Sequence, residues 1–167
     1  MLGLRWRDVD LDASVLQVRH GMQRLQGAWT FVEPKSQKSR RTIVLNSLAV
    51  EALRRHRTRQ TAERLRNGRY WEDWDLVFAN ELGKPMEVSN LTHRYFRPLL
   101  KLADLPQIRF HDLRHSAATL MLGANVNVKL VSEMLGHSQT AFTMDRYQHV
   151  SLAMQREAAR AVQIALS

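Results

Sequence analysis

The run Arg109-Phe110-His111-Asp112-Leu113-Arg114-His115 begins the part of the chain in which the apolar residues follow a helical period to the C-terminus. The first predicted helix covers 111–122 and ends at Gly123, because glycine favours the residue after a helix. Further helices are expected over 128–135, ended by Gly136, and over 141–148 and 152–166. This part of the chain is therefore predicted to be a helical bundle.

The sequence before that run has a different period. Residues 15–20, 29–33 and 41–45 are short, alternating and rich in β-branched side chains, which indicates strands. Residues 21–27 are expected to form a turn, and 1–12 to be a tail. The three strands are predicted to pair as a small antiparallel sheet.

Two further helices are expected between the sheet and the bundle. Asn46 or Ser47 can cap a helix that ends before Asn67-Gly68. Ser89 is expected to cap the next one, which has Leu91, Tyr95, Leu99 and Leu102 on its apolar side. Pro98 can kink this helix. The predicted fold class is α+β and mainly α-helical, with a small three-stranded antiparallel sheet beside a helical bundle.

The composition of the chain limits the classes of binding partner and of chemistry. Lys and Arg total 25 against 16 Asp and Glu, which gives a formal net charge of +9 and an isoelectric point near 10.8. This charge favours nucleic acid or another anionic surface as partner. The absence of cysteine excludes disulfides, thiolate zinc sites and thiol nucleophiles. No stretch approaches the ~20 apolar residues of a membrane span, and no signal peptide opens the chain, so a cytoplasmic location is expected.

Three side chains have the chemistry to act on a phosphodiester. His111 and Arg114 are three residues apart on a predicted helix and therefore share a face. Arginine offers a planar, permanently charged fork that fits phosphate oxygens, and histidine transfers protons near neutral pH. Tyr147 follows farther along the chain, and a phenol needs a base or a positive field to act as a nucleophile.

Three motifs together resemble the catalytic signature of the tyrosine recombinases, the phage-integrase family. They are the 109–115 run, Leu135-Gly136-His137-Ser138 and Asp145-Arg146-Tyr147-Gln148-His149-Val150, in the order expected for that family. The resemblance also includes 2–11, Glu33-Pro34-Lys35 and 89–105, and so extends over nearly the whole chain.

The resemblance implies a role for each matched residue. Tyr147 would attack the scissile phosphate, leaving a 3′-phosphotyrosine and a free 5′-hydroxyl. Arg114 would stabilise charge on the non-bridging oxygens, His111 would assist proton transfer with the tyrosine, and His137 would donate a hydrogen bond to the phosphate. Lys35 would be the general acid that protonates the leaving 5′-oxygen.

The basic segment around Lys35 carries further expectations. Lys38 competes with Lys35 for the role of general acid. Lys38, Arg40 and Arg41 are also expected to contact double-stranded DNA, the partner that the resemblance implies. No metal or other cofactor is expected, since arginine and lysine supply the positive charge.

The sequence departs from the family pattern at its N-terminal end. The family carries a further arginine in a Thr-Gly-x-Arg-x-Gly-Glu stretch upstream of the segment equivalent to 2–10, and no residue here matches it. Residues 1–167 are thus expected to be a single integrase-like catalytic domain, without its beginning and without the family's N-terminal DNA-clamping domain. A fragment, a start codon placed too late and a degenerate remnant all fit this pattern.

A DNA-binding module without catalysis is one alternative. It rests on the unmatched arginine and on a basic helix that contains Arg54, Arg55, Arg57, Arg59, Arg64 and Arg66. It predicts salt-sensitive binding that Tyr147→Phe leaves unchanged, and no covalent adduct.

A metalloprotease is a second alternative, because His111 and His115 have the i, i+4 spacing of a zinc-binding helix. Asp112 replaces the usual glutamate, and Arg114 would lie beside the metal, so this reading is disfavoured.

Self-association is expected from the last segment. Residues 152–166 place Leu152, Ala158, Val162 and Leu166 on one stripe. In the resembled family, the segment after the tyrosine docks on a neighbour in a DNA-bound tetramer.

Overall fold

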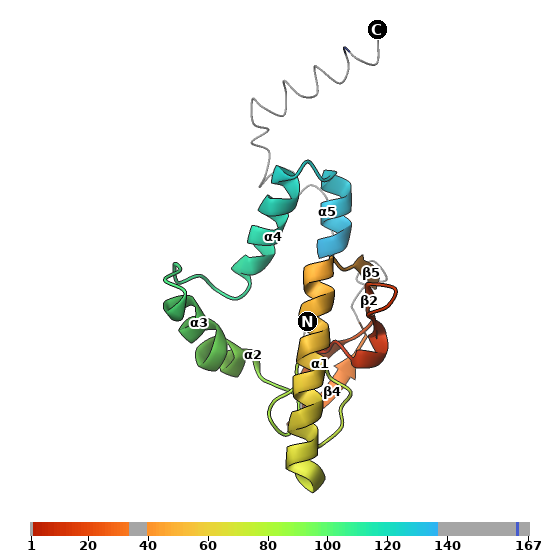
Figure 1. The fold of residues 1–167 in the computed structure, drawn as a ribbon, viewed down its shortest axis with the longest axis vertical. Helices are drawn as coiled ribbons and strands as arrows, with labels where there is room; N and C mark the ends of the chain where they lie inside the picture. Colours follow the sequence, from red (N-terminus) through yellow and green to blue (C-terminus); the bar gives the residue numbers. More distant parts are fainter. Residues whose placement is uncertain (1, 34–39, 137–162, 164–167) are drawn as a thin grey trace. The chain divides into compact units, whose positions relative to one another are not determined.

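In the computed structural model, the described residues are 2–33, 40–136 and 163. The chain divides into two compact units, Met1–Phe110 and His111–Ser167. Figure 1 shows helices and small antiparallel sheets, which confirms the predicted α+β class. The expectation of a single domain over 1–167 stays a prediction.

The strands form two separate sheets, and this corrects the predicted one. A three-stranded antiparallel sheet has the order β1 (Val9–Asp10), β2 (Val15–Val18) and β5 (Arg41–Val44). The predicted strand at 29–33 belongs instead to a hairpin of β3 (Gly21–Leu25) and β4 (Ala28–Val32).

The expected turn over 21–27 is therefore wrong, since only two residues turn. Gln26 and Gly27 have φ values of 49° and 84°. Positive φ at both central positions is the geometry of a type I′ hairpin turn. The usual signal for that turn is Asn-Gly or Asp-Gly, so Gln-Gly left the hairpin unrecognised.

The N-terminal residues are part of the first unit and not a tail. The amide of Trp6 donates to the carbonyl of Asp75 at 2.8 Å, and that of Val77 donates to Leu4 O at 2.9 Å. Arg5 and Leu76 form an antiparallel bridge between these bonds. The segment then continues as η1 (Trp6–Asp8), a short 3-10 helix.

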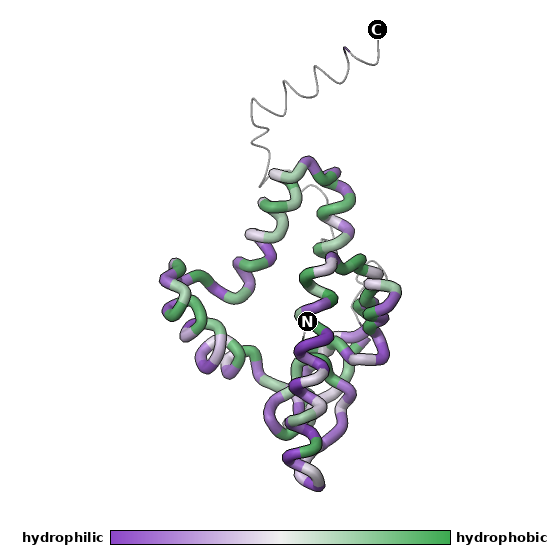
Figure 2. The backbone as a smooth tube through the Cα atoms, viewed as in Figure 1, coloured by the Kyte–Doolittle hydropathy of each residue, from purple (hydrophilic) through white to green (hydrophobic). Residues whose placement is uncertain are grey.

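A long polar helix, α1 (Ser47–Asn67), is anchored to that bridge by one buried amide. Asn46 caps it as predicted, accepting a hydrogen bond from Ala49 N at 2.9 Å, and hydrophilic residues predominate along it (Figure 2). Gln60 is its one buried residue. Its Oε1 accepts from Trp6 Nε1 at 2.6 Å, and its Nε2 donates to Leu76 O at 3.1 Å.

Aromatic rings pack beside this amide. His56 stacks between Trp6 and Phe78, with centroid distances of 6.0 and 5.8 Å. His56 Nε2 also lies 2.6 Å from Val77 O. Since Leu76 and Val77 are buried in the core, α1 gains its packing from a few specific contacts rather than from an apolar stripe.

We predict that Gln60→Ala lowers the free energy of unfolding by about 1–3 kcal/mol, because it leaves the Trp6 indole N–H and Leu76 carbonyl without this partner. Chemical denaturation monitored by circular dichroism measures the change. Thr61→Ala is the matched control, since Thr61 is exposed and donates only to the helical carbonyl of Arg57. Equal stability of the two variants would contradict the anchoring role of Gln60.

A compact loop follows α1 and the short η3 (Gly68–Tyr70). Asn80 Oδ1 accepts from the amides of Leu82 and Lys84, each at 3.0 Å. Gly83 is buried with φ +79°, and a Cβ there would lie 2.2 Å from the backbone oxygen of Glu72. The loop therefore admits only glycine at this position.

We predict that Gly83→Ala destabilises the fold by more than Gly27→Ala does. Both glycines have positive φ, which costs other residues roughly 1–3 kcal/mol, but a Cβ at Gly27 would meet nothing within 4 Å. Thermal unfolding of both variants separates the cost of backbone conformation from that of overlap. Equal loss of stability would show that the loop can relax around the new methyl group.

The helical stretch over 88–102 differs from its prediction in two ways. It begins at Val88 with Glu87 at the cap position and no side-chain cap, so the expected Ser89 cap is wrong. Its central part is a π-helical turn. The stretch comprises α2 (Val88–Asn90), η4 (Leu91–Phe96) and α3 (Arg97–Leu102).

The π turn changes which face of this stretch is buried. Proline lacks an amide and its ring clashes with the carbonyl four residues earlier, and Pro98 lies two residues after the end of the π turn. Phe96 and Leu100 are 8% and 5% exposed, whereas Leu102, expected to line the apolar side, is 86% exposed. Phe96 packs edge-to-face on Phe110 at 5.2 Å.

The second unit contains two contacting helices, α4 (Asp112–Gly123) and α5 (Val128–Leu135). Both were predicted, but the expected end of the first at Gly123 is wrong, because Gly123 lies within α4 and Ala124 takes the C-cap position. Apolar and polar residues alternate along them (Figure 2), and Ala118 and Val131 are buried at 1% and 0% exposure. Within the described residues, no helix has both the length and the apolar character that crossing a membrane requires.

Candidate active site and nucleic-acid interface

The start of α4 brings two predicted catalytic residues together. His111 takes the cap position with helical dihedrals, φ −66° and ψ −26°, and its carbonyl accepts from Arg114 N at 3.0 Å. His111 is exposed and Arg114 half-buried. Asp112 provides a negative charge in the first turn, which the helix dipole favours. One helical turn therefore fixes an imidazole and a guanidinium on neighbouring positions.

His115 packs on His111 in the same helix. The two rings meet edge to face, with centroids 5.7 Å apart and planes at 85°. Among the described residues, no group of three or more histidine, aspartate or glutamate side chains is placed to hold a metal ion. His115 is half-buried.

The other predicted catalytic residues lie outside the described residues. These are Lys35, His137 and Tyr147, together with Lys38. Gly136, which precedes His137, ends α5 in the left-handed conformation with φ 71° and ψ 44°. Its amide donates to Ser132 O at 2.9 Å and to Glu133 O at 3.1 Å, so the predicted end of this helix is confirmed.

The predicted DNA-binding arginines lie at the start of β5. Arg41 faces Val18 across the sheet. Arg40 pairs with Glu33 at 2.9 Å, so this ion pair links the two residues that flank 34–39, the segment that contains Lys35 and Lys38. Arg40 and Arg41 line a groove of about 630 Å³ that also includes Arg19 and His20. Arg19 and His20 were not among the residues predicted to bind DNA, although a basic pair at the end of a strand is a usable signal.

The arginines of α1 mostly engage neighbouring side chains. Arg54 pairs with Asp12 at 2.7 Å, Arg55 with Glu51 at 2.7 Å and Arg64 with Asp73 at 3.0 Å. Arg57 lies over the Trp6 ring at 5.2 Å, and Arg59 contacts His56 at 3.1 Å.

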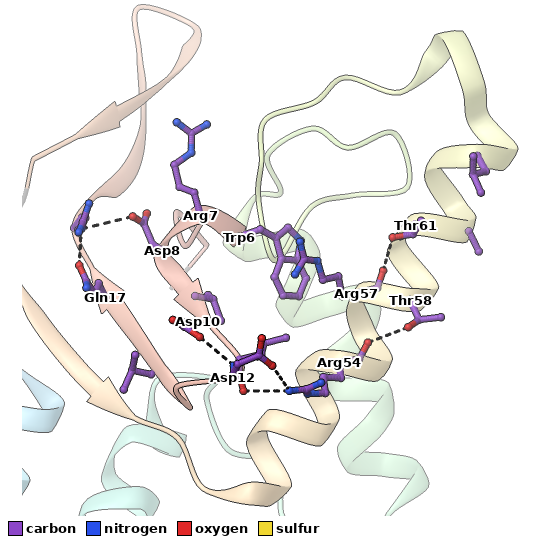
Figure 3. Close-up of a pocket in the computed structure, with 16 residues that line it drawn as sticks. Trp6, Arg7, Asp8, Asp10, Asp12, Gln17, Arg54, Arg57, Thr58 and Thr61 are labelled. Carbon is purple, nitrogen blue, oxygen red and sulfur yellow. Dashed lines mark hydrogen bonds and ion pairs between the residues drawn. The ribbon is translucent and has the colours of Figure 1, made fainter.

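A large groove runs between α1 and the N-terminal segment, and Figure 3 shows Arg54 reaching Asp12 across it. Its volume is about 1070 Å³. Its lining includes Asp8, Asp10 and Asp12 together with Arg7, Arg19, Arg54 and Arg57, so its charge is mixed. A surface of this kind is less suited to a phosphate backbone than one of a single sign.

The phenol of Tyr95 has the wrong environment for a nucleophile. Desolvation first, and then the negative charge of Glu81, raise its pKa above the ordinary value. Its hydroxyl donates to Glu81 Oε1 at 3.2 Å. Tyr95 is therefore held as the neutral phenol, which makes it a useful comparison for Tyr147.

Comparison with known proteins identifies relatives along most of the chain. The model of the phage integrase family matches residues 1–154. A "Tyrosine recombinase XerC-like" protein of Caldanaerobacter subterraneus is 35% identical over 162 residues, which is 90% of this chain and 41% of that protein. An "Integrase" of Streptomyces ambofaciens is 38% identical over 119 residues, covering 70% of this chain and 30% of that protein. The chain thus spans less than half the length of these relatives.

Solved structures have the same fold. The Tn1549 transposon integrase in complex with circular intermediate DNA aligns with a TM-score of 0.75 at 24% identity, over 96% of this chain and 54% of that one. XerA recombinase aligns with a TM-score of 0.68 at 23% identity, over 96% of this chain and 50% of that one. With the family match over 1–154, these findings establish that the chain belongs to the phage integrase family of tyrosine recombinases.

Proposed function

We propose that this chain cleaves and rejoins DNA strands through a covalent 3′-phosphotyrosine intermediate, in site-specific recombination or integration. One observation carries the proposal: in a member of the phage integrase family, His111 and Arg114 occupy a single turn at the start of α4. A guanidinium and an imidazole held on one turn are groups that can bind a phosphate and transfer a proton beside it.

The proposed reaction exchanges one phosphate ester for another. The phenolic oxygen of Tyr147 attacks the scissile phosphorus as it loses its proton, with His111 assisting that transfer. The bond to the 5′-oxygen breaks, and Lys35 protonates the leaving oxygen, with Lys38 as the competing donor. Attack by a 5′-hydroxyl on the phosphotyrosine reverses these steps, so rejoining needs no ATP because the ester bond is retained.

Positive charge is the main contribution of the remaining groups. Arg114 binds the non-bridging oxygens, where charge grows in the transition state, and His137 donates a hydrogen bond to them. Both act by electrostatic stabilisation. Losing one such donor in other enzymes costs about 2.7–4 kcal/mol in the barrier.

We predict that Tyr147→Phe abolishes a covalent protein–DNA adduct and the relaxation of supercoiled plasmid, because the phenolic oxygen is the nucleophile. A denaturing gel detects the adduct and an agarose gel the relaxation. Tyr95→Phe is the matched control, since it removes a phenol that is held neutral beside Glu81, and it should retain both activities.

The possible outcomes of that experiment support different functions for this chain. An adduct that survives Tyr147→Phe would refute the proposed nucleophile. Salt-sensitive DNA binding by the wild type and by Tyr147→Phe, with no adduct and no relaxation from either, would favour a DNA-binding module without catalysis. The catalytic proposal would then have failed for this chain.

We also infer that the chain self-associates on double-stranded DNA through the apolar stripe of 152–166. We predict that Leu166→Asp lowers the number of protomers bound per duplex, because a carboxylate on the stripe is costly to bury. Size-exclusion chromatography with light scattering measures the complexes. Ser167→Asp, which adds the same charge one residue beyond the stripe, should leave them unchanged, and a strictly monomeric wild-type chain on DNA would refute the inference.

A further inference from the structure

The groove beside β5, with a volume of about 630 Å³, has a basic lining that the proposed reaction does not use. We name it the β2–β5 groove, because its walls come from the end of β2 and the start of β5. It is lined by Gln17, Val18, Arg19, His20, Glu33, Arg40, Arg41 and Thr42. Three guanidinium groups face one carboxylate in this lining, so its net charge favours an anion.

Arg19 is held in the groove by contacts at one nitrogen only. Its Nε donates to Gln17 Oε1 at 2.7 Å and lies 3.7 Å from Asp8 Oδ1. Among the described residues, neither terminal nitrogen has a partner, and the side chain is 55% exposed. The end of the guanidinium that forks onto a phosphate is therefore available.

A buried carboxylate lies near the same nitrogen of Arg19. The Asp8 side chain is 3% exposed and pairs with Arg5 Nε at 3.0 Å through Oδ2. Its Oδ1 is buried without a hydrogen-bond partner in the described structure, and Arg19 Nε lies 3.7 Å from this oxygen. Because this pair restrains the guanidinium before any ligand arrives, less side-chain entropy is lost on binding.

The single acidic residue of the groove does not block an anion. Glu33 pairs with Arg40 at 2.9 Å, but these side chains are 74% and 53% exposed. Exposed ion pairs contribute little to stability, so a phosphate can replace the carboxylate at Arg40.

The groove also lies next to the segment that carries Lys35. Glu33 and Arg40 directly flank residues 34–39, so covalent continuity keeps Lys35 two residues from the groove lining. In the proposed reaction Lys35 contacts the scissile phosphate, so the groove offers further cations to the same duplex.

We propose that the β2–β5 groove binds a backbone phosphate of duplex DNA near the cleaved bond, with Arg19 as a contact residue and Gln17 and Asp8 as its positioning residues. The proposal rests on the proposed function, and it adds Arg19 and a defined surface to the two arginines predicted from the sequence. Contact to a phosphate carries no sequence information, so it strengthens binding to every duplex alike.

The test measures binding of the full 167-residue chain to a fluorescent, mixed-sequence DNA duplex by anisotropy over a series of salt concentrations. Arg19→Gln and Arg40→Gln should each lower the slope of log affinity against log salt by about one, because each removes one phosphate contact. Arg19→Lys keeps the charge and should restore the slope. Arg69→Gln is the control, since it removes an equal charge from a side chain that lies on Tyr70, and it should leave the slope unchanged.

Circular dichroism establishes that each variant is folded. If Arg19→Gln unfolds, Arg40→Gln still tests the proposal, because among the described residues Arg40 pairs only with an exposed carboxylate. If Arg19→Gln and Arg40→Gln keep the wild-type slope and a Tyr147-dependent adduct still forms, the groove does not bind the proposed phosphate, and the proposed function stands. A wild-type chain that neither binds duplex nor forms an adduct would overturn both.

Discussion

The backbone bridge between the N-terminal residues and the strand-like segment after α1 is the constraint on which the first unit depends. Leu4 and Trp6 bond to Val77 and Asp75 across more than 65 positions of sequence. Gln60 then joins both sides through its single amide. A helix as polar as α1 has little apolar surface to bury, so these directional contacts replace the hydrophobic stripe that most surface helices use.

Ion pairs also hold parts of the first unit together. Asp8 is almost completely buried and pairs with Arg5 Nε at 3.0 Å, while Arg19, which follows β2 and is 55% exposed, lies 3.7 Å from its other oxygen. Removing one partner of a buried pair costs far more than the pair contributes, so this arrangement fixes geometry more than it adds stability. The β2–β5 groove inherits that geometry, because its Arg19 is one of the two basic partners.

The proposed chemistry and the proposed DNA-binding surface come from different parts of the chain. His111 and Arg114 are fixed by one helical turn, which requires only local backbone hydrogen bonds. Arg19, Arg40 and Arg41 converge only because β2 and β5 pair antiparallel with Val18 opposite Arg41. In this chain the first set thus lies within a short motif, whereas the second depends on strand pairing.

The sequence by itself determined the features that are local: the α+β class, the helices over 111–122 and 128–135, the Asn46 cap, the Gly136 helix end and the family signature. It misplaced the 29–33 strand, the Ser89 cap and the buried face of 88–102, because a type I′ turn of Gln-Gly and a π turn before Pro98 leave weak local signals. Only the tertiary structure decided that residues 4–6 pair with 75–77 and that Arg19 belongs to a groove with Arg40. Those contacts join residues far apart in the chain, and no local periodicity encodes which distant partner a strand or a charge will meet.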